Sequence, residues 1–213
     1  MTAGPAGNRS CRKQRAELTD RLDFAPATPE RWAGLKRLFA ACGDARGCWC
    51  GFWYRPNRDF RAGWGDDNRK FLQRIVAGGA EPGVLAYRDG EAVGWCGIAP
   101  REAQPKLARS RVLAPVDEQP VWSITCFVVA KGCRRQGLMR PLIGAALAHA
   151  GRQGARIVEA YPIDAQRKLS SGELYVGTPA AFRDLGFVEV ARRSPTRPIM
   201  RRRLERSSGA QPS

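Results

Sequence analysis

The stretch that decides the fold reads Val121-Trp-Ser-Ile-Thr-Cys-Phe-Val-Val129 and, after one alanine, Lys131-Gly-Cys-Arg-Arg-Gln-Gly-Leu-Met139. Its first part carries no charge and is rich in β-branched and aromatic residues, which predicts a central strand covered on both faces. After the turn, apolar residues recur at helical spacing, at Leu142, Ile143, Ala146, Leu147 and Ala150. The sequence therefore predicts a buried strand that leads through a basic turn into a helix.

The basic turn (residues 131–139) is a predicted anion site. The first N–H groups of a helix have no partner within the helix, and the positive end of the helix dipole lies behind them. Lys131, Arg134 and Arg135 add positive charge, and Gly137 has no Cβ to keep an anion away from the backbone. The expected ligand is a phosphate group.

The turn also carries a family resemblance. Arg134-Arg-Gln-Gly-Leu-Met139 resembles the Arg/Gln-x-x-Gly-x-Gly/Ala signature of the GNAT superfamily of acyl-CoA-dependent N-acyltransferases, although Met139 stands where the family usually has Gly or Ala. The resemblance implies acetyl-CoA as cosubstrate, without a metal. It also implies that the pyrophosphate binds to Arg134, Arg135, Gln136, Gly137, Leu138 and Met139, and the pantetheine arm to the backbone of Phe127, Val128 and Val129.

The order of elements resembles the same superfamily from about Leu22 to Arg203. The implied fold is α/β (α+β), with a mixed, mostly antiparallel sheet of about seven strands and helices on both faces. Residues 1–20 are expected to be a disordered basic leader, 21–204 the GNAT domain and 205–213 a disordered tail. Strands are expected at 21–25, 84–88, 92–98, 121–129, 156–161, 188–191 and 197–203, and helices from Pro29 to Cys42, at 66–77, after the basic turn and at 180–185.

Composition limits the class of protein. The chain has 213 residues, of which 43% are apolar, as expected of one globular domain. No apolar run approaches the ~20 residues that span a bilayer. The N-terminus has no apolar segment after its basic residues, so it is not a secretory signal. We therefore expect a cytoplasmic protein with no membrane partner, whose seven cysteines are free thiols.

The formal charge of +16 raises the alternative of a nucleic-acid-associated protein. Many of the basic residues lie toward the two ends of the chain, and there is no zinc-finger spacing or RNA-binding aromatic signature. No specific nucleic-acid partner is expected. The charge suits an anionic cofactor and disfavours a polycationic substrate.

The segment Gly47-Cys-Trp-Cys-Gly-Phe-Trp-Tyr54 has three interpretations and resembles a Cys-Trp-Cys-containing bacterial GNAT subgroup. A metal site would use Cys42, Cys48 and Cys50, but their spacings are not those of zinc fingers. A redox site would need C-x-x-C, which is absent. The favoured interpretation is a loop that packs over the sheet and walls the acceptor pocket. The long connection from Pro100 to Pro120 is interpreted as a lid or as a second part of that wall.

The catalytic acid and base are less defined. The segment 181–187 resembles the family's Tyr-x-x-x-Gly-Phe ending, in which the tyrosine often protonates the CoA thiolate, but Phe182 occupies that position. A phenyl ring cannot donate a proton, so Tyr175, Tyr161 or water is expected to replace it. Glu159 is the candidate base, with Glu102 as an alternative. Cys126 could in principle accept the acyl group covalently. A cysteine on a central strand is more often a small core residue, so the structural interpretation of Cys126 is favoured.

These observations predict transfer of an acetyl or other small acyl group from acyl-CoA to a primary amine of a small molecule or protein, directly within a ternary complex. A non-catalytic acyl-CoA sensor is the competing class, because the usual tyrosine is missing. The sequence does not identify the acceptor, and it leaves a homodimer open.

Overall fold

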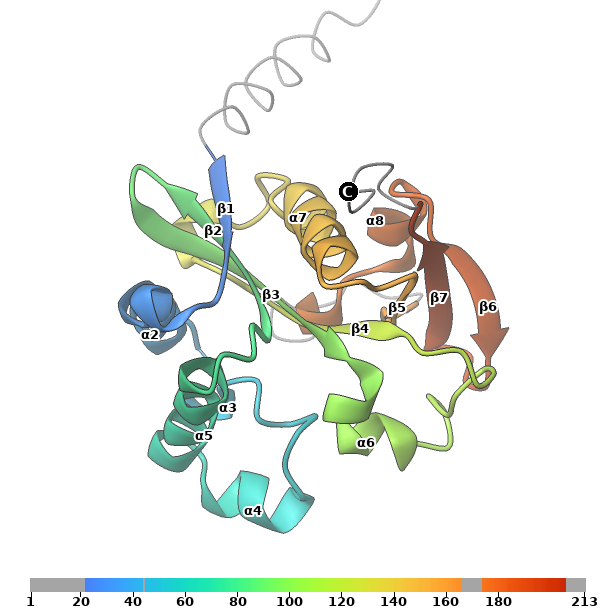
Figure 1. Cartoon of the computed structure of the whole chain (residues 1–213), viewed down its shortest axis with the longest axis horizontal. Helices are drawn as coiled ribbons and strands as arrows, with labels where there is room; N and C mark the ends of the chain where they lie inside the picture. The colour runs from blue at the N-terminus through green and yellow to red at the C-terminus, as the bar shows by residue number, and fades with distance from the viewer. Residues whose placement is uncertain (1–21, 44, 166–173, 206–213) are drawn as a thin grey trace, which may run out of the picture.

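The computed structural model describes residues 22–43, 45–165 and 174–205. They form a seven-stranded sheet in the order β1-β2-β3-β4-β5-β7-β6 (Figure 1). Only the neighbours β4 and β5 are parallel. The strands are β1 (Leu22–Pro26), β2 (Gly83–Arg88), β3 (Glu91–Pro100), β4 (Trp122–Val129), β5 (Ile157–Ala160), β6 (Val188–Arg192) and β7 (Pro198–Arg203). The predicted mixed, mostly antiparallel sheet is confirmed.

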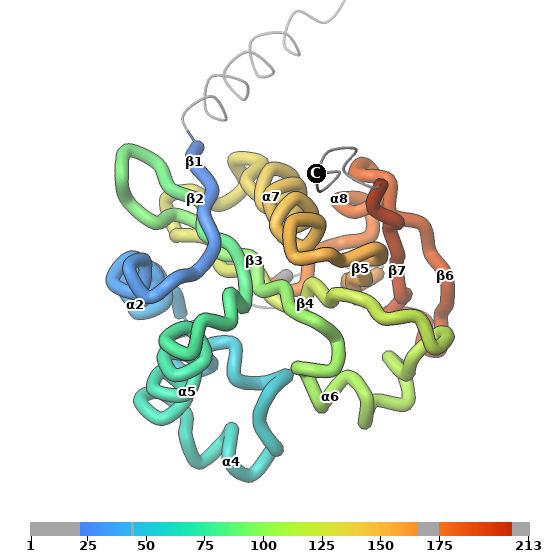
Figure 2. Tube along the Cα trace, viewed as in Figure 1, coloured from blue at the N-terminus to red at the C-terminus, as the bar shows by residue number. Residues whose placement is uncertain are grey.

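Helices cover both faces of the sheet, as Figure 2 shows along the chain trace. One face packs against α7 (Met139–Arg152) and α8 (Pro179–Arg183), and the other packs against α2 (Trp32–Ala40) and α5 (Asp66–Ala77). The shorter helices are α3 (Ala45–Cys48), α4 (Asn57–Ala62), α6 (Pro105–Ala108), η1 (Pro29–Arg31), η2 (Arg101–Ala103), η3 (Lys131–Cys133) and η4 (Leu174–Val176). The sheet is thus the central layer, with an apolar core on each side.

The main differences from the predicted elements lie between α2 and α5. The sequence analysis treated Gly47 to Tyr54 as a loop and predicted no helix before residue 66, whereas α3 overlaps the start of that segment and α4 follows it. Both helices are too short to be stable alone, so tertiary contacts stabilise them. The buried side chain of Asn68 donates hydrogen bonds to the carbonyls of Gly47 and Phe60, and so ties these two segments to α5.

The connection between β3 and β4 is folded rather than open. It contains η2 and α6, and Leu107 and Leu113 are buried with Trp53, Tyr161 and Ile199 in a third apolar cluster. The expected lid is therefore a packed segment that covers one end of the sheet.

β4 has one free edge, and this feature positions the site. β3 runs beside β4 along most of its length, but β5 pairs only with residues 122–124 of β4. The register between β3 and β4 shifts at Thr125, which leaves that residue without a partner in the ladder. Bulges of this kind bend a strand and are common beside active sites. Residues 126–129 consequently have no strand paired with them on the β5 side.

The predicted basic leader and the predicted tail after residue 205 lie outside the described residues. The six cysteines that are described are free thiols. Within the described ranges, every helix is too short or too polar to cross a bilayer.

Candidate functional site

A cavity of about 780 Å³ opens beside the free edge of β4. The basic turn forms one end of the cavity, and residues 126–129 of β4 form its floor. The loop from Cys48 to Phe52 and the residues Phe60 and Trp64 form the other end. The volume is within the usual range for small-molecule sites, roughly 300–1,000 Å³.

The backbone of the basic turn is shaped to receive an anion. Arg135 and Gly137 both have left-handed φ angles, of 60° and 84°. Such residues among right-handed ones turn successive N–H groups toward a common point. No side chain caps the start of α7, and among the described residues no acceptor binds the backbone N–H groups at 137–140. These groups are available to a phosphate.

The side chains of the turn have different roles. Arg134, Arg135, Gly137, Leu138 and Met139, five of the residues in the predicted phosphate site, line the cavity. Gln136 does not, because its amide nitrogen donates to the Gly132 carbonyl at 2.7 Å and its oxygen accepts from Arg88. Met139 replaces the usual small residue without blocking the turn, because its sulfur points toward Gly177.

The predicted pantetheine surface also lines the cavity. Phe127, Val128 and Val129 are all lining residues. The Val129 carbonyl already accepts hydrogen bonds from Arg134 Nε at 3.1 Å and from the thiol of Cys42. This carbonyl therefore holds the basic turn in place and has little capacity left for a ligand.

The Cys-Trp-Cys loop packs over the sheet and lines the opposite end of the cavity. Trp49 stacks on Phe39 with a centroid distance of 5.2 Å, and Trp53 Nε1 donates to the Thr125 carbonyl at 3.2 Å. Trp49 and Cys50 both have left-handed φ angles, of 47° and 51°. Backbone strain of this type persists only where surrounding contacts impose it. The strain places Cys50 Sγ 3.3 Å from the Trp95 indole nitrogen.

The thiols in this region are held in their neutral form. Burial raises the pKa of Cys48 to about 12. A hydrogen bond with Cys126, together with burial, raises the pKa of Cys50 well above its ordinary value. Because the thiolate is the nucleophile and metal ligand, Cys48 and Cys50 are poor candidates for either role at neutral pH. Their positions in the wall of the cavity favour the packing interpretation.

The two aromatic candidates for the proton donor lie in different environments. Tyr175 lines the cavity and is 38% exposed. Burial lowers the pKa of Arg197, and the nearby Tyr175 opposes that shift. Phe182 is fully buried, with its ring centroid 5.1 Å from that of Phe187. Phe182 is thus a packing residue, whereas Tyr175 is the tyrosine among the described residues that lines the cavity.

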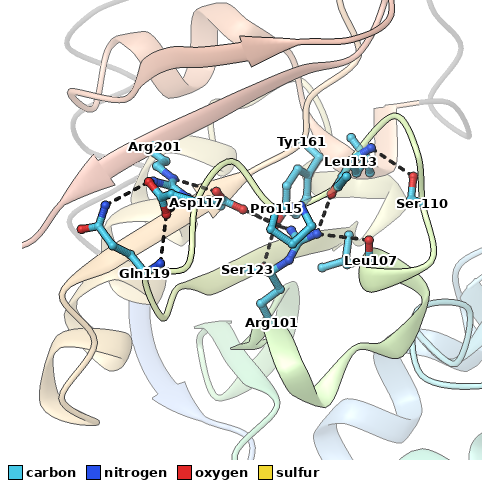
Figure 3. Close-up of polar contacts among 12 residues, drawn as sticks. Arg101, Leu107, Ser110, Leu113, Pro115, Asp117, Gln119, Ser123, Tyr161 and Arg201 are labelled. Carbon is cyan, nitrogen blue, oxygen red and sulfur yellow. Dashed lines mark hydrogen bonds and ion pairs between the residues drawn. The ribbon is translucent and has the colours of Figure 1, made fainter.

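Glu159 lies outside the cavity lining and is buried in an ion-pair network. Its carboxylate accepts from Arg201 Nε at 2.7 Å, from the Tyr161 hydroxyl at 2.7 Å and from Arg101 Nη1 at 3.2 Å. Figure 3 shows Arg101, Tyr161 and Arg201 converging on this point. Burial is the main reason why the pKa of Tyr161 is raised above its ordinary value. The side chains of Glu159 and Tyr161 therefore already have hydrogen-bond partners within the network. Glu102, the alternative base, is exposed and does not line the cavity.

The sequence analysis missed three residues of the site. Phe60 and Trp64 line the cavity from α4 and the turn after it, and Arg88 contacts Gln136 from the end of β2. The spacing of Phe60 and Trp64, four residues apart, was an available signal for one helical face. Nothing local indicates Arg88, because its contact spans 48 residues of sequence.

Comparisons with known proteins agree with this geometry. The profile of the acetyltransferase (GNAT) family matches residues 49–170. A GNAT acetyltransferase of Listeria monocytogenes aligns at 14% identity with a TM-score of 0.54, over 86% of this chain and 95% of that one. PaiA N-acetyltransferase of Thermoplasma acidophilum, solved with coenzyme A, aligns at 12% identity and a TM-score of 0.49, over 86% and 99% of the two chains.

YncA of Salmonella typhimurium, an acetyltransferase solved with acetyl-CoA, aligns at 12% identity and a TM-score of 0.49, over 89% of this chain and 97% of that one. No curated protein sequence matches the chain. At these identities the solved structures show only that the fold is shared. The family profile covers more than half of the sequence and therefore shows the family. The chain therefore belongs to the GNAT acetyltransferase family.

Proposed function

We propose that this GNAT acetyltransferase transfers an acetyl group from acetyl-CoA to a primary amine of a small molecule or protein, by direct transfer within a ternary complex. The observation that carries the proposal is one cavity lined by the basic turn with its unbonded N–H groups, by residues 126–129 at the free edge of β4, and by the rings of Phe52, Phe60 and Trp64. A cavity of this form can hold two substrates end to end.

The residues fit coenzyme A by charge and by backbone availability. The N–H groups at 137–140, with Arg134 and Arg135 beside them, would hold the pyrophosphate. The backbone of Phe127 and Val128 would hold the pantetheine amides as an added strand does. When bound, the cosubstrate supplies an activated acetyl thioester.

The chain itself contributes positioning and a proton. Holding two reactants in contact is worth up to ~7–11 kcal/mol of the barrier. Tyr175 would donate its phenolic proton to the leaving sulfur, and the Arg197 guanidinium beside it would stabilise the phenolate. Glu159 has no part in this proposal, because three donors already occupy its carboxylate.

An acyl-CoA sensor is the second candidate, and Phe182 in place of the family tyrosine favours it. Thiol release from acetyl-CoA in the presence of an amine panel separates the two classes, because a sensor would bind coenzyme A without turnover. With Tyr175→Phe, an acetyltransferase should lose about 10²-fold or more in kcat with little change in KM for acetyl-CoA. An unchanged kcat would remove Tyr175 from the mechanism.

The binding site is tested with Gly137→Glu. A carboxylate at the centre of the turn repels the pyrophosphate, so affinity for coenzyme A in calorimetry should fall below detection while circular dichroism still shows a folded protein. Gly144→Glu adds the same charge on α7 where nothing lies within 4 Å, and should bind normally. Gly137→Asn controls for the left-handed backbone, which Asn tolerates. Wild-type affinity in Gly137→Glu would contradict the site.

A further inference from the structure

The acceptor end of the cavity has an aromatic wall, which consists of Phe52, Phe60 and Trp64. Neighbouring rings meet edge to face, with Phe52 and Trp64 each 5.6 Å from Phe60 between centroids. Phe52 is 37% and Trp64 is 53% exposed, so both rings show a large part of their surface to the space beside them. Edge-to-face contacts hold rings at defined angles and leave other ring surface free for a further aromatic partner.

The backbone fixes this wall before any ligand binds. Asn68 is fully buried, and its amide donates to the carbonyls of Gly47 and Phe60, both at 3.1 Å. A Cβ on Gly47 would lie 2.1 Å from the Trp64 ring, so only glycine lets the backbone pack directly on the indole. The wall is therefore a built surface rather than a chance group of exposed side chains.

The charges around the wall disfavour an ammonium ion. Among the cavity-lining residues that the structure describes, the charged side chains are Arg134 and Arg135, and none is a carboxylate. Lys106 Nζ lies 3.8 Å from the Phe52 centroid and 5.0 Å from that of Phe60. This nitrogen is buried and has no hydrogen-bond partner in the described part of the chain. A protonated amine would thus meet apolar rings and a like charge.

A nucleophile for acyl transfer must be unprotonated, and among the described residues no carboxylate lines the cavity to remove a proton from an ammonium. An alkylamine with a pKa of about 10 is neutral in only about one molecule per thousand at pH 7. An amine on an aromatic ring is already neutral at that pH. The electron-rich ring of such an amine also suits a wall in which the Lys106 ammonium group lies against the ring of Phe52.

We propose that the acceptor is an aromatic amine, with its nitrogen attached to the ring and uncharged at pH 7, whose ring packs against Phe52, Phe60 and Trp64. The proposal rests on the acetyltransferase function above and specifies its acceptor. The amine nitrogen forms a bond to the acetyl carbon while the bond from that carbon to the CoA sulfur breaks. The nitrogen loses one proton to solvent, and the sulfur gains one from Tyr175, so the products are an aryl acetamide and free coenzyme A.

Three amines of similar size test the proposal with the full chain and acetyl-CoA: 4-methylaniline, benzylamine and cyclohexylamine. The aniline should have at least about a tenfold higher kcat/KM at pH 7 than either alkylamine, despite its weaker intrinsic nucleophilicity. Its rate should stay level from about pH 6 to 8, whereas alkylamine rates should rise about tenfold per pH unit.

Variants of the wall supply a readout that does not depend on turnover. Phe60→Ala and Trp64→Ala should each weaken calorimetric binding of 4-methylaniline to the CoA complex by about tenfold and leave the Kd for coenzyme A unchanged. Phe24→Ala removes an equally exposed aromatic ring on β1, away from the cavity, and should change neither value.

The outcomes distinguish the acceptor from the function. If benzylamine or cyclohexylamine is the better substrate, or if the wall variants bind the aniline normally, the aromatic-amine proposal is overturned and the acetyltransferase function stands. If no amine in a broad panel releases thiol and coenzyme A does not bind, both proposals are overturned.

Discussion

Arg88 shows how one residue can act on a site from outside the cavity. Its Nη1 donates to Gln136 at 3.2 Å, whereas its Nε and Nη2 are buried and have no hydrogen-bond partner among the described residues. A buried guanidinium with unused donors is costly unless something nearby benefits from its charge. The basic turn, whose proposed ligand is a pyrophosphate, is in direct contact with it through Gln136.

We therefore predict that Arg88→Gln weakens coenzyme A binding about tenfold, the size expected when one charged hydrogen bond is lost. Arg88→Lys should recover part of the affinity, because it restores the charge without the bond to Gln136. Arg74→Gln, an exposed arginine on α5, is the matched control. Calorimetry at low and high salt measures all three, and equal affinity of Arg88→Gln and the wild type at low salt would contradict the role.

At the scale of elements, the site depends on two departures from regular structure. β4 separates from β5 after residue 124, which opens the cavity floor. The region between α2 and α5 folds into α3 and α4, two short helices that carry or flank the aromatic wall. Neither short helix is stable alone, so the wall depends on the side chain that connects them, Asn68.

Asn68→Ala should lower the free energy of unfolding by about 1–3 kcal/mol, because it removes the hydrogen bonds that the buried Asn68 amide donates to the carbonyls of Gly47 and Phe60. The KM for the amine should rise and the Kd for coenzyme A should change little, since the basic turn lies at the other end of the cavity. Urea denaturation and steady-state kinetics measure these effects. Asn57→Ala, at an exposed asparagine on α4, should behave as the wild type. If Asn68→Ala lowers the stability but leaves the KM for the amine unchanged, our assignment of the acceptor end is contradicted.

At the scale of the whole molecule, several arginines near the C-terminal end of the chain form ion pairs with carboxylates. The sequence analysis counted the arginines of residues 192–203 as part of a basic end, but β6 and β7 contain most of them. Arg201 pairs with Glu159 and Asp117, and Arg192 pairs with Glu189 and Asp164. Figure 3 shows Arg201 and Gln119 around Asp117. These contacts fasten the connection between β3 and β4 to β7.

The Asp117 pair gives a pH dependence of stability. Hydrogen bonds from Arg201 hold the pKa of Asp117 well below its usual value. A carboxyl whose pKa is depressed in the folded state stabilises the fold above its unfolded pKa, about 3.9, and this contribution is lost as the pH falls below that value. Wild-type unfolding free energy should therefore decline below about pH 4, and Asp117→Asn should reduce that decline.

Urea denaturation between pH 3 and pH 7 measures the Asp117 effect. Asp66→Asn, at an exposed aspartate at the start of α5, is the control for loss of one carboxylate. If the pH profiles of Asp117→Asn and the wild type run parallel, the Arg201 pair does not contribute to acid stability.

Local patterns in the sequence were enough to determine the strands, α5, α7 and the basic turn with its available N–H groups. These features depend on residues that are close in sequence: alternation, helical spacing, Asp89-Gly90 between two strands, and glycine at a left-handed position. The same proximity explains why the family signature at residues 134–139 could be read directly.

The tertiary structure alone decided the rest of the site, because the contacts involved join residues far apart in the chain. Glu159 has a suitable chemistry for a base, but Arg101 and Arg201, distant in sequence by 58 and 42 residues, bind its carboxylate in the core. Tyr175 reaches the cavity because η4 packs against β4, and the aromatic wall reaches it because α3 packs against α5 and α2. Side-chain type follows from sequence, whereas availability for chemistry depends on which partners the folded chain brings within hydrogen-bond distance.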